Sequence, residues 1–387
     1  MTLYIIISLL MLFGVFNYDC RNFLFGKRFY YIFIFICLTL LLGFRYRVGG
    51  DSLSYEDSYG SMPTFRDLKL YGLYYNPTLL AYQPLWLYLV ALAKWIGKDY
   101  YLFQLIHASI VNFLLSIYIF KNSSKPFSVI LFLFITHFYF YLTIEVEREI
   151  LAIGVFLLNF KNLQNKKWRN YYLLCLVSFM FHISALFLFF LPLFRNINLS
   201  RKTIVTVVII LSPIIFFKET FVEILKPLMF MEVMSSKFES YSEIEFSFLG
   251  TIYHYTGRVL MVFPLLFYNY LVSKNKNIQW LLNLYIIISV LSLALVGFER
   301  FLNYLLLPYL LIFIDYLYKM PYNLFIFKRS LLIICTVFNL CSNIPSRLLT
   351  INKYGTPYRS LFVPYVSIFD PYYVRDREDY IRELWDL

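Results

Sequence analysis

The chain has 387 residues, of which 60% are hydrophobic, 21% aromatic and only 15% charged. This composition excludes a soluble globule with a polar surface and predicts a polytopic membrane protein. The net charge of +12 is spread over short connections between apolar runs, which argues against a nucleic-acid-binding protein. The five cysteines lie mostly inside apolar runs without a CxxC pair, so we expect neither a disulfide framework nor a zinc site.

Basic residues in the connections predict the side of the membrane on which each connection lies. Six short connections carry seventeen Lys and Arg and one acid, Asp19, so we predict them to be cytoplasmic. They are residues 17–28, 121–125, 161–169, 195–202, 273–278 and 319–329. The other polar segments carry seventeen Lys and Arg and twenty-one Asp and Glu, so we predict them to lie outside. They are residues 45–83, 94–99, 144–149, 218–248, 298–300 and 345–387.

Alternation between the two sides predicts an all-α polytopic fold, a single membrane domain over residues 1–387 with about ten transmembrane helices and both termini outside. The spans are 3–16, 29–44, 100–120, 126–143, 149–161, 203–217, 249–272, 279–297, 301–318 and 329–344. The first span has neither the basic region nor the cleavage site of a signal peptide, so we expect it to be retained. The first large outer loop covers residues 45–99. A second outer loop over 218–248 and the tail 345–387 are long enough to cover an external cavity.

Two apolar runs do not fit this alternation as ordinary spans. Residues 84–97 are fewer than the roughly 20 needed to cross a bilayer, so we predict a juxtamembrane or re-entrant helix that begins at Pro84 and stays outside. Residues 170–194 lie between two basic connections. We therefore predict that this run enters and leaves on the cytoplasmic side as two half-helices that break near His182.

The sequence GFRYRVGGDSLSYEDSY, residues 43–59, is the first large polar stretch and predicts a ligand site at the outer surface. Arg45 and Arg47 leave the end of a span two residues apart, and the two glycines that follow let the backbone approach a ligand closely. Asp51 comes directly after them. Such a cluster suits anionic head groups and sugar hydroxyls. The alternative is an ordinary interfacial loop with snorkelling arginines and a tyrosine belt.

Ionisable residues within or beside the other spans are the next signal, because each is costly in a membrane and is rarely kept without a partner. They are Glu145, Arg148, Glu149, His182, His254, Arg258, Glu299 and Arg300. The three arginines of this set are predicted to lie on the same outer side as Arg47, so we expect the four guanidinium groups to converge. The alternatives are structural ion pairs at the helix ends and, for His182, a hydrogen-bonded core histidine. His107 and His137 receive no role.

Four motifs occur in the order FRYRVGGDSLSY, EREILAIGVFLL, FMFHISALFLFFLP and FERFLNYLLLP. These motifs, between residues 43 and 308, resemble those of the EpsG family, which belongs with the Wzy-type polymerases of bacterial surface polysaccharides. The outer loop with its carboxylate and the juxtamembrane helix resemble the GT-C glycosyltransferase architecture. The chain differs from that architecture in lacking a compact DxD metal motif and in having an extra span before the first outer loop.

The resemblance implies a multi-pass polymerase of the bacterial inner membrane, with its site facing the periplasm. Its donor and acceptor would both be undecaprenyl-diphosphate-linked oligosaccharides, which polymerise into O-antigen, capsule or exopolysaccharide. The partners implied are this lipid-linked substrate, the lipid bilayer and a chain-length regulator protein. We expect no nucleic acid partner and no cofactor, and a divalent metal stays open.

The chemistry of such a transfer assigns roles to the candidate residues. Planar guanidinium groups bind a diphosphate bidentately without needing a metal. We assign diphosphate or substrate binding to Arg45, Arg47, Arg148, His182, His254, Arg258, Glu299 and Arg300. Asp51 is the first candidate for the base that takes the proton of the acceptor hydroxyl, and Glu145 is the second. Tyr55 and Tyr59 are candidates for stacking on sugar rings.

Three other functions compete with this hypothesis. A flippase for lipid-linked oligosaccharides would need a large central cationic cavity and often has inverted repeats, which are not detectable in this sequence. A membrane acyltransferase would need a histidine set against an acid within a span, and neither His182 nor His254 has one at suitable spacing. An O-antigen ligase uses the same donor, and the sequence separates it poorly from a polymerase.

Overall fold

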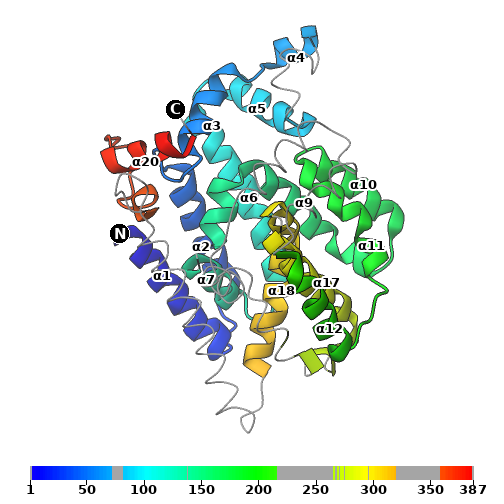
Figure 1. Ribbon diagram of the computed structural model, residues 1–387. Helices are drawn as coiled ribbons and strands as arrows, with labels where there is room; N and C mark the ends of the chain where they lie inside the picture. The colour runs from blue at the N-terminus through cyan, green and yellow to red at the C-terminus, as the bar shows by residue number, and fades with distance from the viewer. Residues whose placement is uncertain are drawn as a thin grey trace. The chain divides into compact units, whose positions relative to one another are not determined.

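The computed structural model describes residues 2–71, 82–136, 138–215, 265, 268–269, 271–273, 275–294, 296–319 and 358–385. Every regular element in these ranges is a helix, as predicted, and their β contacts are two isolated bridges (Figure 1). The chain forms two compact units. Unit 1 is Met1–Ala185 together with Ile344–Leu387, and unit 2 is Leu186–Asn343. The apolar helices confirm the predicted class, a helical membrane protein.

Three described helices are long and apolar enough to cross a membrane, namely Thr2–Cys20, Tyr100–Asn122 and Glu299–Lys319. A fourth is counted if a bent pair of helices after residue 125 is one span. The predicted span 329–344 and most of the predicted span 249–272 lie outside the described residues. The count of about ten spans therefore stays a prediction.

Unit 1 begins with two apolar helices in antiparallel order and ends with a short C-terminal helix beside them (Figure 1). Its elements are α1 (Thr2–Gly14), η1 (Val15–Cys20), α2 (Lys27–Gly43), α3 (Ser52–Ser61), α4 (Phe65–Tyr71), α5 (Pro84–Ile96), α6 (Tyr100–Asn122), α7 (Pro126–Ile135), α8 (Phe138–Phe140), η4 (Tyr141–Glu145), α9 (Glu147–Gln164), α10 (Trp168–Phe179), η12 (Tyr358–Leu361) and α20 (Arg375–Trp385). The predicted spans 3–16, 29–44, 100–120 and 149–161 all coincide with helices of this set.

Helix α6 is the centre of unit 1, because α2 and α9 both pack along it. Asp99 begins α6 by accepting a hydrogen bond from the Tyr101 amide (3.1 Å), which satisfies one free donor of the first turn. Gly154 lets α9 approach closely, since a Cβ at this position would lie 2.6 Å from the Leu114 side chain on α6. Small residues at helix contacts give such close packing in membranes.

A polar junction joins two of the connections that we predict to be cytoplasmic. The buried Asp19 carboxylate accepts hydrogen bonds from the amide (2.7 Å) and the hydroxyl (2.8 Å) of Ser128. Lys125 donates to the side chain of Asn22 (2.8 Å) and to the carbonyl of Asp19. This junction lies near the start of α2, and the polar stretch that begins at Arg45 lies at its other end. The contacts thus group segments of unit 1 as the charge count predicts, and the orientation itself stays a prediction.

The predicted span 126–143 is bent in the structure, and whether it crosses the membrane as one span stays a prediction. Helix α7 ends at Ile135, and α8 with the wider π-helical turn η4 continues at an angle of 84° to it. The Thr136 hydroxyl donates to the Phe132 carbonyl (2.6 Å), a local bond that commonly bends helices. The bend carries η4 to Glu145, which therefore ends beside the polar stretch after α2.

The two unusual apolar runs have the predicted local structure. Helix α5 is short and has Pro84 in its first turn. Helix α10 ends at Phe179, and the 3₁₀ helix η5 (Ile183–Phe190) follows, so the predicted break near His182 is confirmed. The Leu85 amide of α5 donates to the Met180 carbonyl (2.9 Å), which places the break of this run next to the start of α5.

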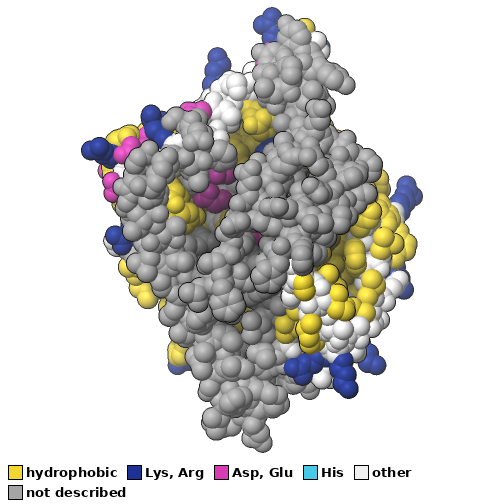
Figure 2. All heavy atoms as spheres, viewed as in Figure 1, with side chains coloured by type: hydrophobic (Ala, Val, Ile, Leu, Met, Phe, Trp, Pro, Cys, Tyr) yellow, Lys and Arg dark blue, Asp and Glu magenta, His cyan; other side chains and the backbone are white. Residues whose placement is uncertain are grey.

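Unit 2 is described through the helices α11 (Leu191–Phe194), α12 (Arg201–Leu211), η6 (Ser212–Ile215), η9 (Lys276–Ile278), α17 (Gln279–Ala294), η10 (Val296–Phe298) and α18 (Glu299–Lys319). Tyr285 on α17 stacks on Tyr309 of α18 with ring centroids 4.2 Å apart. Around α12, hydrophobic side chains such as Ile209 and Ile210 remain on the surface, with Lys and Arg at the edge (Figure 2). This pattern is typical of a lipid-facing helix with a basic end.

Candidate functional site

The loop between α2 and α3, residues 44–51, is called the arginine loop below. Its backbone is unusual at two places, because Arg47 has φ +49° and Gly49 has φ +111°. A glycine adopts such angles easily, whereas a non-glycine residue does so at a cost of about 1–3 kcal/mol and often marks a functional site. The loop therefore holds Arg47 in a conformation that its surroundings must stabilise.

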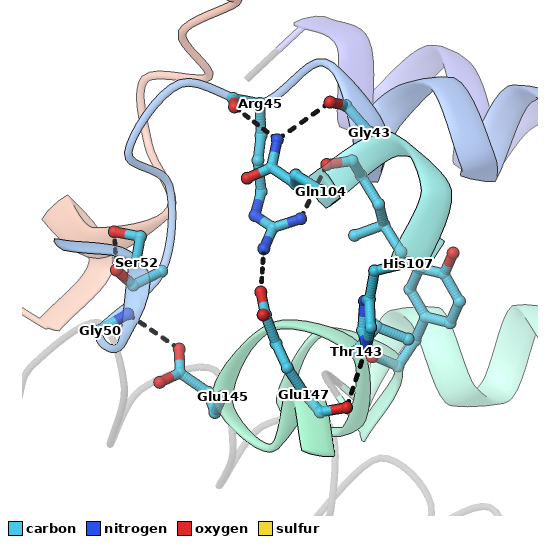
Figure 3. Close-up of polar contacts among 12 residues, drawn as sticks. Gly43, Arg45, Gly50, Ser52, Gln104, His107, Thr143, Glu145 and Glu147 are labelled. Carbon is cyan, nitrogen blue, oxygen red and sulfur yellow. Dashed lines mark hydrogen bonds and ion pairs between the residues drawn. The ribbon is translucent and has the colours of Figure 1, made fainter. Parts of the chain in front are cut away.

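Hydrogen bonds to the two glycines fix the end of the arginine loop (Figure 3). The Gly50 amide donates to the Glu145 carboxylate (2.9 Å), and the Ser52 hydroxyl donates to the Gly49 carbonyl (2.7 Å). Asp51 follows Gly50 directly, is half-buried and precedes the first turn of α3. Both predicted base candidates, Asp51 and Glu145, are thus next to the same glycine.

We expect Gly49→Ala to disrupt the arginine loop. An added Cβ would lie 2.1 Å from Ile144, and the positive φ adds a strain of about 1–3 kcal/mol, so the melting temperature of the purified protein in detergent should fall. Gly60→Ala is the matched control, because a Cβ there meets nothing within 4 Å and Ala favours the helix α3. Equal melting temperatures for the two variants would contradict this account of the loop.

Arg45 lies inside the protein and supports the loop from behind. Only 1% of it is exposed, and its guanidinium donates to Glu147 (2.7 Å) and to the Leu42 carbonyl (2.7 Å). The side chain of Gln104 donates to the carbonyls of Gly43 (2.9 Å) and Arg45 (2.8 Å), as Figure 3 shows. Arg45 therefore occupies a structural position in unit 1, and not the exposed one that our assignment to diphosphate binding requires.

Arg47 is partly exposed and is held by two carboxylates. Its Nε donates to Glu56 (2.8 Å) on α3, and its Nη1 donates to Glu378 (3.1 Å) on α20. Tyr101 on α6 donates to the same Glu56 carboxylate (3.1 Å). Burial lowers the pKa of Arg47, but its hydrogen bonds and charge interactions with Glu56 and Glu378 outweigh this effect and raise the pKa above its ordinary value. Arg47 therefore stays charged, with 28% of its side chain exposed.

Arg148 lies on the first turn of α9, three residues after Glu145. Its guanidinium carbon is 4.6 Å from the centre of the Tyr82 ring, a cation–π contact that orients the charge. Glu145, three residues before Arg148, binds the Gly50 amide, three residues after Arg47, so this hydrogen bond links the two chain segments that carry these arginines. The structure thus brings two of the four predicted arginines to one region of unit 1.

The two tyrosines predicted to stack on sugars lie in different surroundings. Tyr59 is 5% exposed, and its ring is packed against Tyr100 and Phe103, with the Lys94 ammonium 4.9 Å from its centre. Burial raises the pKa of the Tyr59 hydroxyl to about 12. Tyr59 is therefore a core residue of the α3–α6 contact and has no free face for a sugar. Tyr55 is half-buried, with its ring 6.2 Å from that of Trp86.

The remaining predicted residues are His182, His254, Arg258, Glu299 and Arg300. His182 is buried, with Nδ1 2.7 Å from the Ser184 hydroxyl, which agrees with the alternative of a core histidine. Glu299 and Arg300 begin α18 in unit 2, where Glu299 is buried. His254 and Arg258 lie outside the described residues, so the convergence of four arginines stays a prediction.

Sequence reasoning missed the partners that organise the arginines. They are Glu56, Gln104, Glu147 and Glu378. His107 supports Glu147 in turn, because its Nε2 donates to the Glu147 carbonyl (2.8 Å). Glu147 carried a usable signal, because an acid in the first turn of an apolar helix needs a partner. The described ranges contain no group of three or more His, Cys, Asp or Glu side chains arranged to hold a metal ion.

These observations define a helical membrane protein with an arginine–carboxylate site at one end of its first unit. The sequence model of the EpsG family matches residues 28–367, which is most of the chain. The protein therefore belongs to the EpsG family, as the four motifs predicted. Membership of this family suggests a polysaccharide polymerase and a role in polysaccharide biosynthesis at the membrane. Neither the curated proteins nor the solved structures include a match to this chain.

Proposed function

We propose that this protein is a glycosyltransferase that polymerises polyprenyl-diphosphate-linked oligosaccharide repeat units on the outer face of the inner membrane. The observation that carries the proposal is Arg47, strained, permanently charged and partly exposed, beside two glycines and two candidate carboxylates in an EpsG-family chain. A lipid diphosphate is a doubly charged group at a membrane surface, which suits guanidinium groups held in fixed planes.

In the proposed reaction, Arg47 and Arg148 bind the diphosphate of the donor. The acceptor hydroxyl oxygen forms a bond to the anomeric carbon while the bond from that carbon to the diphosphate oxygen breaks. The electron pair leaves with the diphosphate, whose growing charge the arginines stabilise. The hydroxyl proton passes to a carboxylate, for which Asp51 is the first choice, because it directly follows the two glycines that let a ligand approach the backbone.

The wider architecture belongs to the same proposal. About ten spans, a GT-C-like arrangement and a periplasmic site would place the arginine loop where lipid-linked units arrive after crossing the membrane. Undecaprenyl diphosphate is the proposed lipid carrier of both donor and acceptor, and a chain-length regulator is a proposed protein partner. The residues of unit 2 assigned to substrate binding, Glu299 and Arg300, as well as His254 and Arg258, stay in this proposal.

The test is deletion of the gene in its native host, followed by complementation and a gel of the surface glycan. We expect the ladder to collapse to single capped repeat units, since chain growth alone is lost. Wild type should restore the ladder and Asp51→Asn should not, because the amide keeps the size and lacks the basic oxygen. Asp57→Asn, an exposed carboxylate on the same helix α3, is the matched control and should restore it.

Two outcomes would overturn the proposal. Accumulation of lipid-linked polymer in the deletion strain would indicate a ligase, because polymerisation would then have continued without this protein. A normal ladder in the deletion strain would exclude a required role in polymer growth. If Asp51→Asn alone restored the ladder, the base would be reassigned to Glu145, and Glu145→Gln should then be inactive.

A further inference from the structure

We infer that the C-terminal segment, residues 358–385, completes the site, and that Glu378 is a positioning residue that sets the plane of the Arg47 guanidinium. The inference rests on the proposed function, in which Arg47 binds the diphosphate of the donor. The family match ends at residue 367, so α20 and Glu378 lie beyond the matched residues.

The C-terminal segment holds the backbone on both sides of Arg47. The Tyr46 amide donates to the Val366 carbonyl (2.8 Å), and the Gly49 amide donates to the Leu361 carbonyl (2.9 Å). The Ile368 amide in turn donates to the carbonyl of Phe44 (3.0 Å). In Figure 3 the pale red ribbon of this segment runs beside the arginine loop. These bonds offset the strain of the positive φ at Arg47, which the loop could not maintain alone.

Helix α20 is itself anchored to the rest of the segment. Arg377 is 1% exposed and donates to the carbonyls of Ser360 (3.1 Å) and Pro364. Its neighbour Glu378 lies in the first turn of α20, with 4% of its side chain exposed. Burying a charged carboxylate costs free energy, so it is found buried only with a charged or hydrogen-bonded partner. For Glu378 that partner is Arg47.

The geometry around Arg47 explains why two carboxylates are present. A guanidinium has five N–H donors in one plane. Glu56 accepts from Nε (2.8 Å) and Nη2 (3.5 Å), and Glu378 accepts from Nη1 (3.1 Å). The two carboxylates bind the Arg47 guanidinium from two directions. Among the described contacts, these bonds leave one N–H donor on each terminal nitrogen for a ligand. Guanidinium N–H donors of this kind bind the oxygens of a phosphate. Glu378 adds a bond on the terminal nitrogen that Glu56 does not reach, and so constrains the group from a second direction.

The test uses the full chain purified in detergent, with farnesyl diphosphate as the probe and its stabilisation of the melting temperature as the measure of affinity. We expect Glu378→Gln to weaken binding of the probe about 10- to 100-fold, as for loss of a hydrogen bond to a charged group. Asp379→Asn is the matched control. It lies next to Glu378, is exposed and pairs with Arg375 (3.4 Å), so its affinity should equal that of wild type.

A double variant separates positioning from mere structural support. In an Arg47→Gln background, adding Glu378→Gln should cause no further loss of affinity, because Glu378 acts only through Arg47. A general structural role would instead add its own loss. Glu378→Asp keeps the charge, and we expect part of the affinity to return when it replaces Glu378→Gln. If the melting temperature of Glu378→Gln is too low for the measurement, the affinity of Glu378→Asp is measured in its place.

Three results are decisive. Wild-type affinity in both Glu378→Gln and Glu378→Asp, with weak binding in Arg47→Lys, would overturn the role of Glu378 and leave the proposed function intact. Additive losses in the double variant would overturn positioning through Arg47. Equal affinity of wild type and Arg47→Lys for the probe would remove the diphosphate site itself, and with it the proposed function of Arg47.

Discussion

Replacing Arg47 with Lys is expected to abolish polymer formation while the amount of protein in the membrane stays the same. Lysine keeps the positive charge but has three donors instead of five and no planar fork, so it cannot replace the three bonds to Glu56 and Glu378 and still offer a donor to the diphosphate. Loss of a preorganised donor to the leaving group typically costs about 100- to 1,000-fold in rate. The measurement is the surface-glycan ladder in the deletion strain complemented with the variant, together with an immunoblot of the membranes.

Arg66→Lys is the control for this experiment. Arg66 is an exposed residue of α4 on the same predicted outer loop, so the identical change at this position should leave the ladder unchanged. A full ladder with Arg47→Lys would show that a point charge is sufficient at this position. Arg47 would then be a structural ion-pair partner of Glu56 and Glu378 and not a diphosphate ligand.

The largest effect on stability is expected at the buried pair of Arg45 and Glu147. Both side chains are almost fully buried and are joined at 2.7 Å, so removing one leaves the other as an uncompensated buried charge. We expect Glu147→Ala or Arg45→Ala to lower the free energy of unfolding by about 3–5 kcal/mol. The measurement is the loss of folded protein with temperature in detergent.

The same pair provides a second, opposite test. The double variant Arg45→Met and Glu147→Leu removes both charges and keeps most of the volume, so it should recover most of the lost stability. Arg375→Ala, which breaks an exposed pair with Asp379, should cost less than about 1 kcal/mol and serves as the control. If the double variant were as unstable as the single ones, the shape of the two side chains and not their charge pairing would determine the stability of this region.

Sequence reasoning predicted the features that depend on neighbouring residues. Pro84 begins α5, the run around His182 breaks where a polar residue interrupts an apolar helix, and the basic connections at 17–28 and 121–125 meet at one end of unit 1. Each of these features leaves a local signal in composition or spacing. The four motifs also predicted the family, because their order is specific although each is short.

The rest depends on contacts between residues far apart in the chain. Arg45 and Glu147 are 102 positions apart, and no pattern near either residue names the other. Tyr59 is one tyrosine among 36 in the sequence, and the weakly amphipathic helix α3 does not show from its sequence that this ring faces the core. The bend after Ile135 follows from a single hydroxyl within an apolar run, which hydrophobic periodicity does not detect.

The docking of the C-terminal segment on the arginine loop also determines when the site can form. Glu378 is 331 positions after Arg47, so a ribosome must add these 331 residues before the two side chains can meet. The helices that carry the loop are synthesised and enter the membrane before α20. Until α20 docks, Glu56 is the carboxylate partner of Arg47. The site is therefore complete only after α20 has been synthesised and has docked on the arginine loop.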